Sequence, residues 1–252
     1  MPSISEILER IRLTRGDLNN LTPALVLEIF LELSIGDISI LCRASKKFND
    51  ECLRESLWKT KVWADFGVDK KYGETWRETA KNMFIIGMIN LGKQWFDGRT
   101  YKQVFEKALN EGEDGAKYLR DIQADAIMKT MDYDRGDAES FSFFPYEEFS
   151  EDIRAFFTDE EYKEADETIE SMKIILSEEF SIIASVAVIL SKSYPMIPGG
   201  PRLASNLGIH QNPSSTLTFI ISKVIDPIPY IMQACAYVKD DKSEVIYKFY
   251  SQ

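Results

Sequence analysis

This chain of 252 residues contains a single histidine, His210, and only three cysteines, Cys42, Cys52 and Cys235. A His-based metal site or a Ser-His-Asp triad would need His210 inside a convergent cluster, yet its neighbours indicate a loop. Three cysteines, odd in number and sparse, predict no disulfide framework; they indicate a reducing compartment and free, buried thiols. The sequence therefore predicts a protein that is not an enzyme and that holds no metal or cofactor.

Long apolar stretches are missing as well. Residues 1–10 lack the apolar core of a signal peptide. The most apolar run, residues 180–190, is about half as long as a membrane span and contains serines. We therefore expect no membrane partner and an intracellular location, either cytoplasmic or nuclear.

Basic residues are outnumbered by acidic ones, 30 Lys and Arg against 41 Asp and Glu, which gives a net charge of −11. The excess is concentrated in residues 145–180, which hold 13 acidic and three basic residues. A basic face for nucleic acid is therefore not expected. The acidic segment could attract a basic partner, but the simpler interpretation is the solvated face of a helix.

Residues 17–66 predict a set of short helices. Thr22 is a good N-cap and Pro23 suits the first helical position. Gly36 would end this helix, and Asp37 would cap the next one. Apolar positions at helical spacing are Leu25, Ile29 and Leu33, then Ile38, Leu41 and Ala44, then Phe48 and Cys52, and finally Trp58 and Val62. Because helices this short are marginal alone, they must pack on one another.

The same segment resembles an F-box. The residues that carry the resemblance are Leu21-Thr22-Pro23, Leu25, Glu28-Ile29-Phe30, Leu33, Asp37-Ile38, Leu41, Ala44, Lys46-Lys47-Phe48 and Leu57-Trp58. The resemblance implies a three-helix module that docks onto the Skp-type adaptor of a cullin ubiquitin ligase. It also implies a partner-binding surface made by Leu21, Pro23, Ile29, Ile35, Ile38 and Leu41.

Two positions depart from the family pattern and leave two functions open. Thr22 separates Leu21 from Pro23, and Ile35 stands where the family carries proline. The first function is a non-catalytic adaptor that recruits a target to the ligase. The second is a structural or interaction protein that uses the bundle only for packing. The stretch from Leu57-Trp58 to Gly67 is also similar to F-box-like proteins of large DNA viruses, which adds a virus particle as a possible location.

The rest of the chain predicts two domains, 1–72 and 73–252. Ser3 and Glu6 form a capping box for an amphipathic helix over 3–15. The middle of the chain predicts helices, one of them built on Trp76, Ala80, Met83 and Phe84. Residues 132–146, which include Arg135-Gly136-Asp137, predict a polar loop or a short hairpin. A strong amphipathic helix should follow from Asp159.

The C-terminal third predicts a small antiparallel sheet. Residues 182–190 are rich in β-branched side chains and fit either a buried strand or a buried helix. Residues 216–224, 230–238 and 244–250 predict strands, and 239–243 would join the last two as a hairpin. The expected fold class is therefore α+β: an F-box-like helical bundle, a mainly helical middle and a C-terminal sheet. No repeat motif indicates which target the second domain binds.

Overall fold

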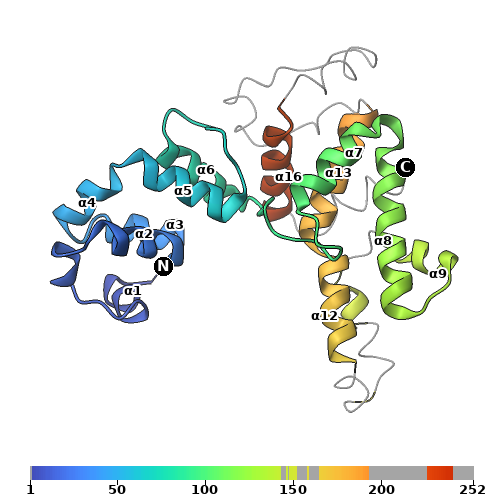
Figure 1. Ribbon diagram of the computed structural model, residues 1–252, viewed down its shortest axis with the longest axis horizontal. Helices are drawn as coiled ribbons and strands as arrows, with labels where there is room; N and C mark the ends of the chain where they lie inside the picture. The colour runs from blue at the N-terminus through green and yellow to red at the C-terminus, as the bar shows by residue number, and fades with distance from the viewer. Residues whose placement is uncertain are drawn as a thin grey trace. The chain divides into compact units, whose positions relative to one another are not determined.

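A computed structural model of the chain describes residues 2–142, 146, 148–151, 158, 165–192 and 226–240. In these residues the regular structure consists of α-helices and two short 3-10 helices, with no β-strand. The chain divides into two units, Met1–Met88 and Ile89–Gln252. In Figure 1 the helices of unit 1 run from blue to teal, and those of unit 2 run from green to red.

The predicted C-terminal sheet is wrong for the described residues. The expected strand 230–238 lies inside helix α16 (Ile228–Asp240), and the ambiguous run 182–190 lies inside helix α13 (Glu178–Lys192). The buried residues Ile231, Cys235 and Val238 recur at helical spacing, and this period outweighs the β-forming composition. The expected strands 216–224 and 244–250 lie outside the described residues. What the structure describes is therefore mainly α-helical, not α+β.

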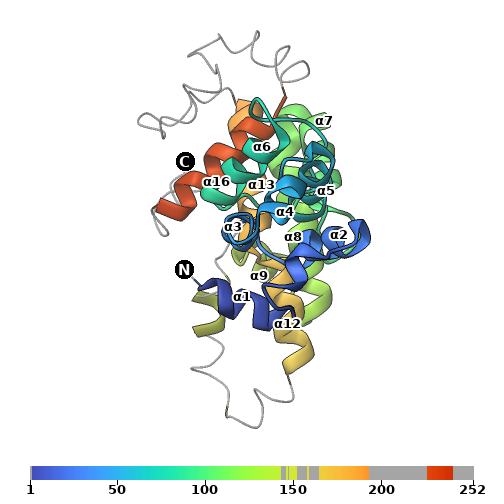
Figure 2. The same ribbon diagram turned by 90° about the vertical axis from the view of Figure 1, so that its left-hand side faces the viewer.

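Unit 1 is a bundle of short helices. They are α1 (Ile4–Arg10), the 3-10 helix η1 (Asp17–Asn19), α2 (Pro23–Glu32), α3 (Ile35–Leu41), α4 (Lys46–Cys52), α5 (Glu55–Phe66) and α6 (Trp76–Ile86). Two predicted caps are confirmed: Thr22 accepts a hydrogen bond from the backbone of Leu25, and Ser3 and Glu6 form a capping box. The predicted cap at Asp37 is wrong, because Asp37 lies inside α3 and Ser34 caps that helix. Figures 1 and 2 show α1 lying beside α3.

Two predicted helix boundaries in unit 1 are wrong. Helix α1 ends at Arg10 and does not continue to residue 15. Gly36 lies within α3 and does not end α2, because Ser34 caps α3 by accepting a hydrogen bond from the Asp37 backbone at 3.1 Å. The absence of a side chain at Gly36 instead admits the ring of Phe84, whose Cζ would lie 3.0 Å from an added Cβ.

Unit 1 extends to Met88, so it includes α6, which the sequence assigned to the second domain. Helix α6 packs against α5 and α3. The buried centre of the unit is aromatic: the ring of Trp58 meets Phe30 edge-on at 5.1 Å, and Phe30 lies 6.1 Å from Phe48. Trp58 also donates its indole N–H to the Cys52 carbonyl at 2.7 Å. This arrangement ties α2, α4 and α5 to one core.

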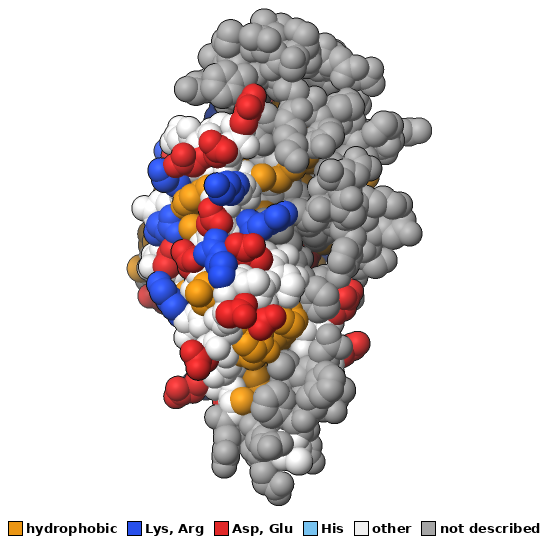
Figure 3. Space-filling view, turned by 90° about the vertical axis from the view of Figure 1, so that its right-hand side faces the viewer, with side chains coloured by type: hydrophobic (Ala, Val, Ile, Leu, Met, Phe, Trp, Pro, Cys, Tyr) orange, Lys and Arg blue, Asp and Glu red, His pale blue; other side chains and the backbone are white. Residues whose placement is uncertain are grey.

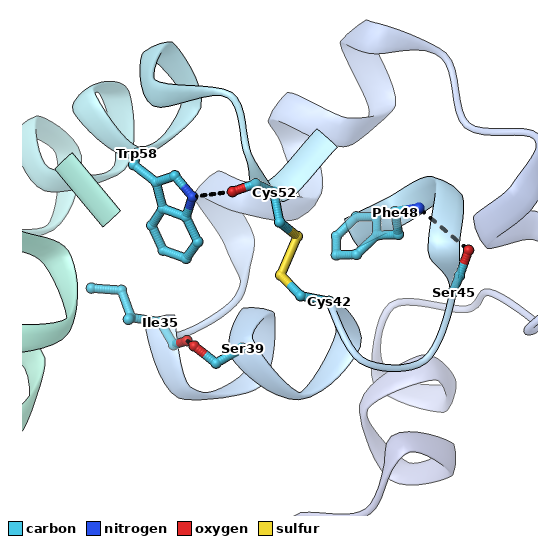
Figure 4. The surroundings of a disulfide bond; sticks show 7 residues. All are labelled: Ile35, Ser39, Cys42, Ser45, Phe48, Cys52 and Trp58. Atoms are coloured by element: carbon cyan, nitrogen blue, oxygen red, sulfur yellow. Dashed lines mark hydrogen bonds between the residues drawn. A yellow bond between two sulfur atoms is a disulfide. The ribbon is translucent and has the colours of Figure 1, made fainter. Parts of the chain in front are cut away.

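The prediction of free thiols is wrong for two of the three cysteines. Cys42 and Cys52 are joined by a disulfide, with their Cα atoms 6.2 Å apart, a distance typical of such bonds. Figure 4 shows the bond between the end of α3 and the end of α4, with the rings of Phe48 and Trp58 on either side. Cys235 is a buried thiol, as predicted.

Unit 2 is organised around α13. Its other helices are α7 (Tyr101–Asn110), η2 (Gly112–Asp114), α8 (Gly115–Met131), α9 (Arg135–Ser140) and α12 (Asp166–Ile175). Helix α13 packs against α7, α8 and α16 (Figure 1), and nearly all of its described side chains are buried. A helix that is apolar on all sides is stable only in such a central position.

Buried polar contacts fix the helices of unit 2 around α13. The hydroxyls of Tyr101 and Ser177 are 2.8 Å apart, and Gln123 donates to the Ile175 carbonyl at 2.9 Å. The ring of Trp95 stacks on Phe180 at 4.9 Å. These contacts join α7, α8 and α12 to the start of α13 and leave few polar groups unpaired in the core.

The predicted loop at 132–146 contains helix α9 in its described part, so that prediction is wrong. Asp134 caps α9 by accepting a hydrogen bond from the Asp137 backbone at 2.9 Å. The helix predicted from Asp159 is described only over α12, where Ile169 and Met172 are buried at the expected spacing.

Candidate protein-docking surface

The partner-binding residues implied by the F-box resemblance lie around α2 and α3 of unit 1. Pro23 is exposed and Leu21 is half-buried. The other four residues, Ile29, Ile35, Ile38 and Leu41, are each at most 2% exposed. Only the start of α2 therefore presents residues of this set at the surface.

Helix α3 is covered by neighbours from its own unit. Helices α1, α2 and α6 all pack against it. Arg10 of α1 donates a hydrogen bond to the Asp37 carboxylate at 2.5 Å, and Asp37 lies in the first turn of α3. A carboxylate there also interacts favourably with the positive end of the helix dipole. The burial of Ile35 and Ile38 follows from this covering, because both residues face the packed interior.

Helix α2 carries apolar residues on two separate sides. The buried side holds Val26, Ile29 and Phe30. A second group of apolar residues is at least partly exposed and consists of Pro23, Ala24, Leu27 and Leu31, in which Leu27 follows Ala24 by three positions and precedes Leu31 by four. We name these four residues the α2 outer row. Pro23 and Ala24 are exposed, Leu27 is half-buried and Leu31 is 44% exposed, so the bundle itself leaves this row in contact with solvent.

Four other large apolar side chains of unit 1 are exposed, and the sequence did not predict their exposure. Leu53 is 63% exposed and Trp63 is 56% exposed, and Phe84 and Ile85 are also exposed. The available signal was position: Trp63 falls beside the stripe that Trp58 and Val62 form on α5, and so points away from the core. Phe84 was expected on the buried stripe of its helix, yet it lies at the surface over Gly36.

A buried charge pair supports the end of α2. The Lys61 side chain is 3% exposed, and its Nζ lies 2.8 Å from Asp65 and 3.4 Å from the Leu31 carbonyl. Carbonyls in the last turn of a helix lack intrahelical partners and attract cations. Burial raises the pKa of the Asp65 carboxyl, although the nearby Lys61 opposes this change. Lys61 thus couples α5 to the turn that carries Leu31.

The described part of unit 2 contains two buried groups whose pKa values are raised, Tyr101 and Cys235. Burial raises the pKa of Tyr101 to about 12, and it raises the pKa of the Cys235 thiol to about 12 as well. A thiol that stays protonated at neutral pH is a poor nucleophile. His210 lies outside the described residues. Among those that are described, no group of three or more His, Cys, Asp or Glu side chains could hold a metal ion.

Arg135 forms ion pairs with three carboxylates of unit 2. Its guanidinium lies 2.5 Å from Asp121, 2.5 Å from Asp125 and 2.6 Å from Glu139. The hydrogen bond with Glu139, followed by the fields of the other carboxylates, raises the pKa of Arg135. These contacts join α8 to α9, so Arg135 serves the packing of the two helices.

The acidic segment is only partly described, and the face seen in Figure 3 carries charges of both signs. Figure 3 shows acidic and basic side chains interspersed over this face of unit 2. Exposed positions of α8 include Lys117, Arg120 and Lys129 beside Asp125. Mixed charges of this kind create no strong field of one sign. They support neither a nucleic-acid surface nor strong steering of a basic partner at this place.

Within the described ranges, no helix combines the length and the hydropathy that crossing a bilayer requires. Comparisons with protein-family models, with curated proteins and with solved structures found no match to this chain.

Proposed function

We propose that the chain is a non-catalytic adaptor: unit 1 docks a Skp-type protein, and unit 2 holds a target for a cullin ubiquitin ligase. The observation that carries this proposal is the α2 outer row. A helix with apolar residues on two sides is only half covered by its own bundle, and the outer side favours a second protein. The F-box resemblance supplies the class of partner, because Leu21 and Pro23 lie at the start of the same helix.

In this proposal the protein does no chemistry and needs no cofactor. It raises the local concentration of a target near the ubiquitin-carrying enzyme, which is a tethering effect. It acts in the cytoplasm or the nucleus and binds neither nucleic acid nor membrane. Its partners are the Skp-type adaptor and one target protein.

The adaptor interaction is tested by titrating the full chain with a purified Skp-type protein. We expect Leu31→Arg to weaken binding at least tenfold, since burying a leucine contributes roughly 1.5–3 kcal/mol. Arginine is a good helix former near a helix C-terminus, so the bundle should keep its fold. The matched control is Leu53→Arg, which changes an exposed leucine outside α2 and should bind like the parent.

Two results would overturn the proposal. One is a parent protein that does not bind the adaptor at micromolar concentrations. The other is a Leu31→Arg variant that binds as tightly as the parent. Far-ultraviolet circular dichroism of both variants excludes unfolding as the cause of any loss.

A second function is favoured by one specific observation, the burial of Ile29, Ile35, Ile38 and Leu41. If these residues serve only as core, the F-box-like bundle is a packing module in a structural protein, such as a component of a virus particle. The parent protein would then not bind the Skp-type adaptor, and the α2 outer row would mediate assembly of the structural protein. Sedimentation of the parent and of Leu31→Arg over a range of concentrations separates the two functions.

A further inference from the structure

The Cys42–Cys52 disulfide joins the end of α3 to the end of α4 by a covalent bond. Cys42 directly follows the last residue of α3 and Cys52 is the last residue of α4, ten positions later. The intervening chain holds Ser45, which caps α4, and Phe48, which is fully buried. The bond therefore closes a short loop around a core aromatic residue (Figure 4).

The same bond lies against the aromatic centre of unit 1. The Cys52 carbonyl accepts the indole N–H of Trp58 at 2.7 Å, and Trp58 in turn meets Phe30. Both cysteines are buried. Breaking or forming the bond between the sulfur atoms therefore affects the ends of α3 and α4 and the backbone carbonyl that Trp58 of α5 binds.

We propose that Cys42 and Cys52 form a redox-controlled lock on unit 1, which is firmly closed when they are cross-linked and more easily opened when both are thiols. Closing the lock transfers two electrons to a small-molecule disulfide, which leaves as two thiols while the protein gains one S–S bond. Opening reverses this: one thiolate of a small-molecule dithiol attacks a cysteine sulfur and forms a mixed disulfide, with the other cysteine as leaving group. The second thiolate of the reagent then attacks the mixed disulfide, so that the reagent leaves as a cyclic disulfide and the protein holds two cysteine thiols. This inference goes beyond the proposed function and does not depend on it.

The loop length sets the size of the effect. A cross-link between residues ten apart removes conformational freedom from the unfolded chain. By the loop-closure relation, reduction should lower the folding equilibrium constant of unit 1 about 100-fold. Because the sulfur atoms are buried, a reductant reaches them only when α4 opens, so reduction of the native protein should be slow and should speed up in low concentrations of urea.

Thiol counting is the first test. After incubation with a small-molecule disulfide and removal of the reagent, the unfolded chain should show one thiol, that of Cys235, and three after reduction. A Cys235→Ser variant should show none and two. Three thiols in the parent after oxidation, or a mixed disulfide on each cysteine, would overturn the proposal.

Stability is the second test, with hydrogen exchange read on peptides of unit 1 in the full chain. Exchange that reports opening of α3 and α4 should become about 100-fold faster on reduction, both in the parent and in Cys235→Ser. The double variant Cys42→Ser, Cys52→Ser should exchange fast with or without dithiol. If that variant does not fold, the comparison of oxidised and reduced parent decides alone. Equal exchange in both redox states would refute the lock.

Discussion

Trp58 is the position where a small change should reveal how unit 1 is held together. Its side chain is 1% exposed, it touches Phe30 edge-on and it donates to the Cys52 carbonyl. Trp58→Phe keeps an aromatic ring but removes the indole N–H. The buried Cys52 carbonyl then loses this hydrogen bond, which costs roughly 1–3 kcal/mol of stability. The smaller ring adds about 1 kcal/mol for the space that opens. We therefore expect a loss of about 2–4 kcal/mol in the free energy of unfolding of unit 1.

The assay is urea unfolding of the full chain followed by circular dichroism, with hydrogen exchange on peptides of unit 1 to assign the transition. For a unit of this size, the loss corresponds to a Tm lower by roughly 10–25 °C. Trp63→Phe is the matched control on the same helix, because Trp63 is 56% exposed, and it should stay within about 0.5 kcal/mol of the parent. Equal losses of unfolding free energy in both variants, or no loss in Trp58→Phe, would show that Trp58 does not hold the core in this way.

Three further predictions concern a charge pair, a phenol and a glycine. Lys61→Met removes the ammonium from Asp65, and we expect unit 1 to lose about 2 kcal/mol in urea unfolding, less than for a fully buried pair because Asp65 is 26% exposed. Burial raises the pKa of Tyr101 to about 12, so the folded state keeps a proton that the unfolded state loses above about pH 10. The free energy of unfolding of unit 2 should therefore fall between about pH 10 and pH 12, and Tyr101→Phe should make this fall smaller. Gly115→Ala would place a Cβ 2.4 Å from the Ala108 carbonyl oxygen. This clash forces α7 and α8 apart and should lower the free energy of unfolding of unit 2 by about 2 kcal/mol, measured by urea unfolding.

Matched variants make these predictions sharp. Adding Asp65→Asn to Lys61→Met should restore most of the lost stability, because the unpaired charge is gone. Gly136→Ala changes an exposed position of α9, where an added Cβ meets only the Asp134 carboxylate at 3.4 Å. This change should be neutral or stabilising by about 0.5 kcal/mol. If Gly136→Ala destabilises as much as Gly115→Ala, the steric explanation for Gly115 fails. A Tyr101→Phe variant with an unchanged alkaline profile would show that another group dominates there.

Local signals in the sequence predicted part of unit 1 well. Thr22, Pro23, Ser3 and Glu6 start their helices as expected, because capping depends on a few neighbouring atoms. The strand predicted at 230–238 failed for a different reason. β-branched and aromatic residues suit any buried surface, so composition could not separate a strand from helix α16 packed on α13.

The candidate docking surface was predicted only at its edge. Leu21 and Pro23 reach the surface, but α1, α2 and α6 cover α3 and bury Ile35 and Ile38. Leu31 gave no signal of its own, since an apolar residue in an apolar helix can face either way. Its exposure depends on which side of α2 the rest of the bundle occupies.

The sequence by itself determined where α1 and α2 begin, which residues can form apolar stripes, and how scarce histidine and cysteine are. Those properties depend on composition and on contacts a few residues apart. Only the tertiary structure decided that Cys42 meets Cys52, that Phe84 rests on Gly36 and that the α2 outer row stays uncovered. Each of these facts depends on how separate helices are arranged in space, and helical spacing alone carries no information about the partner that an apolar face will meet.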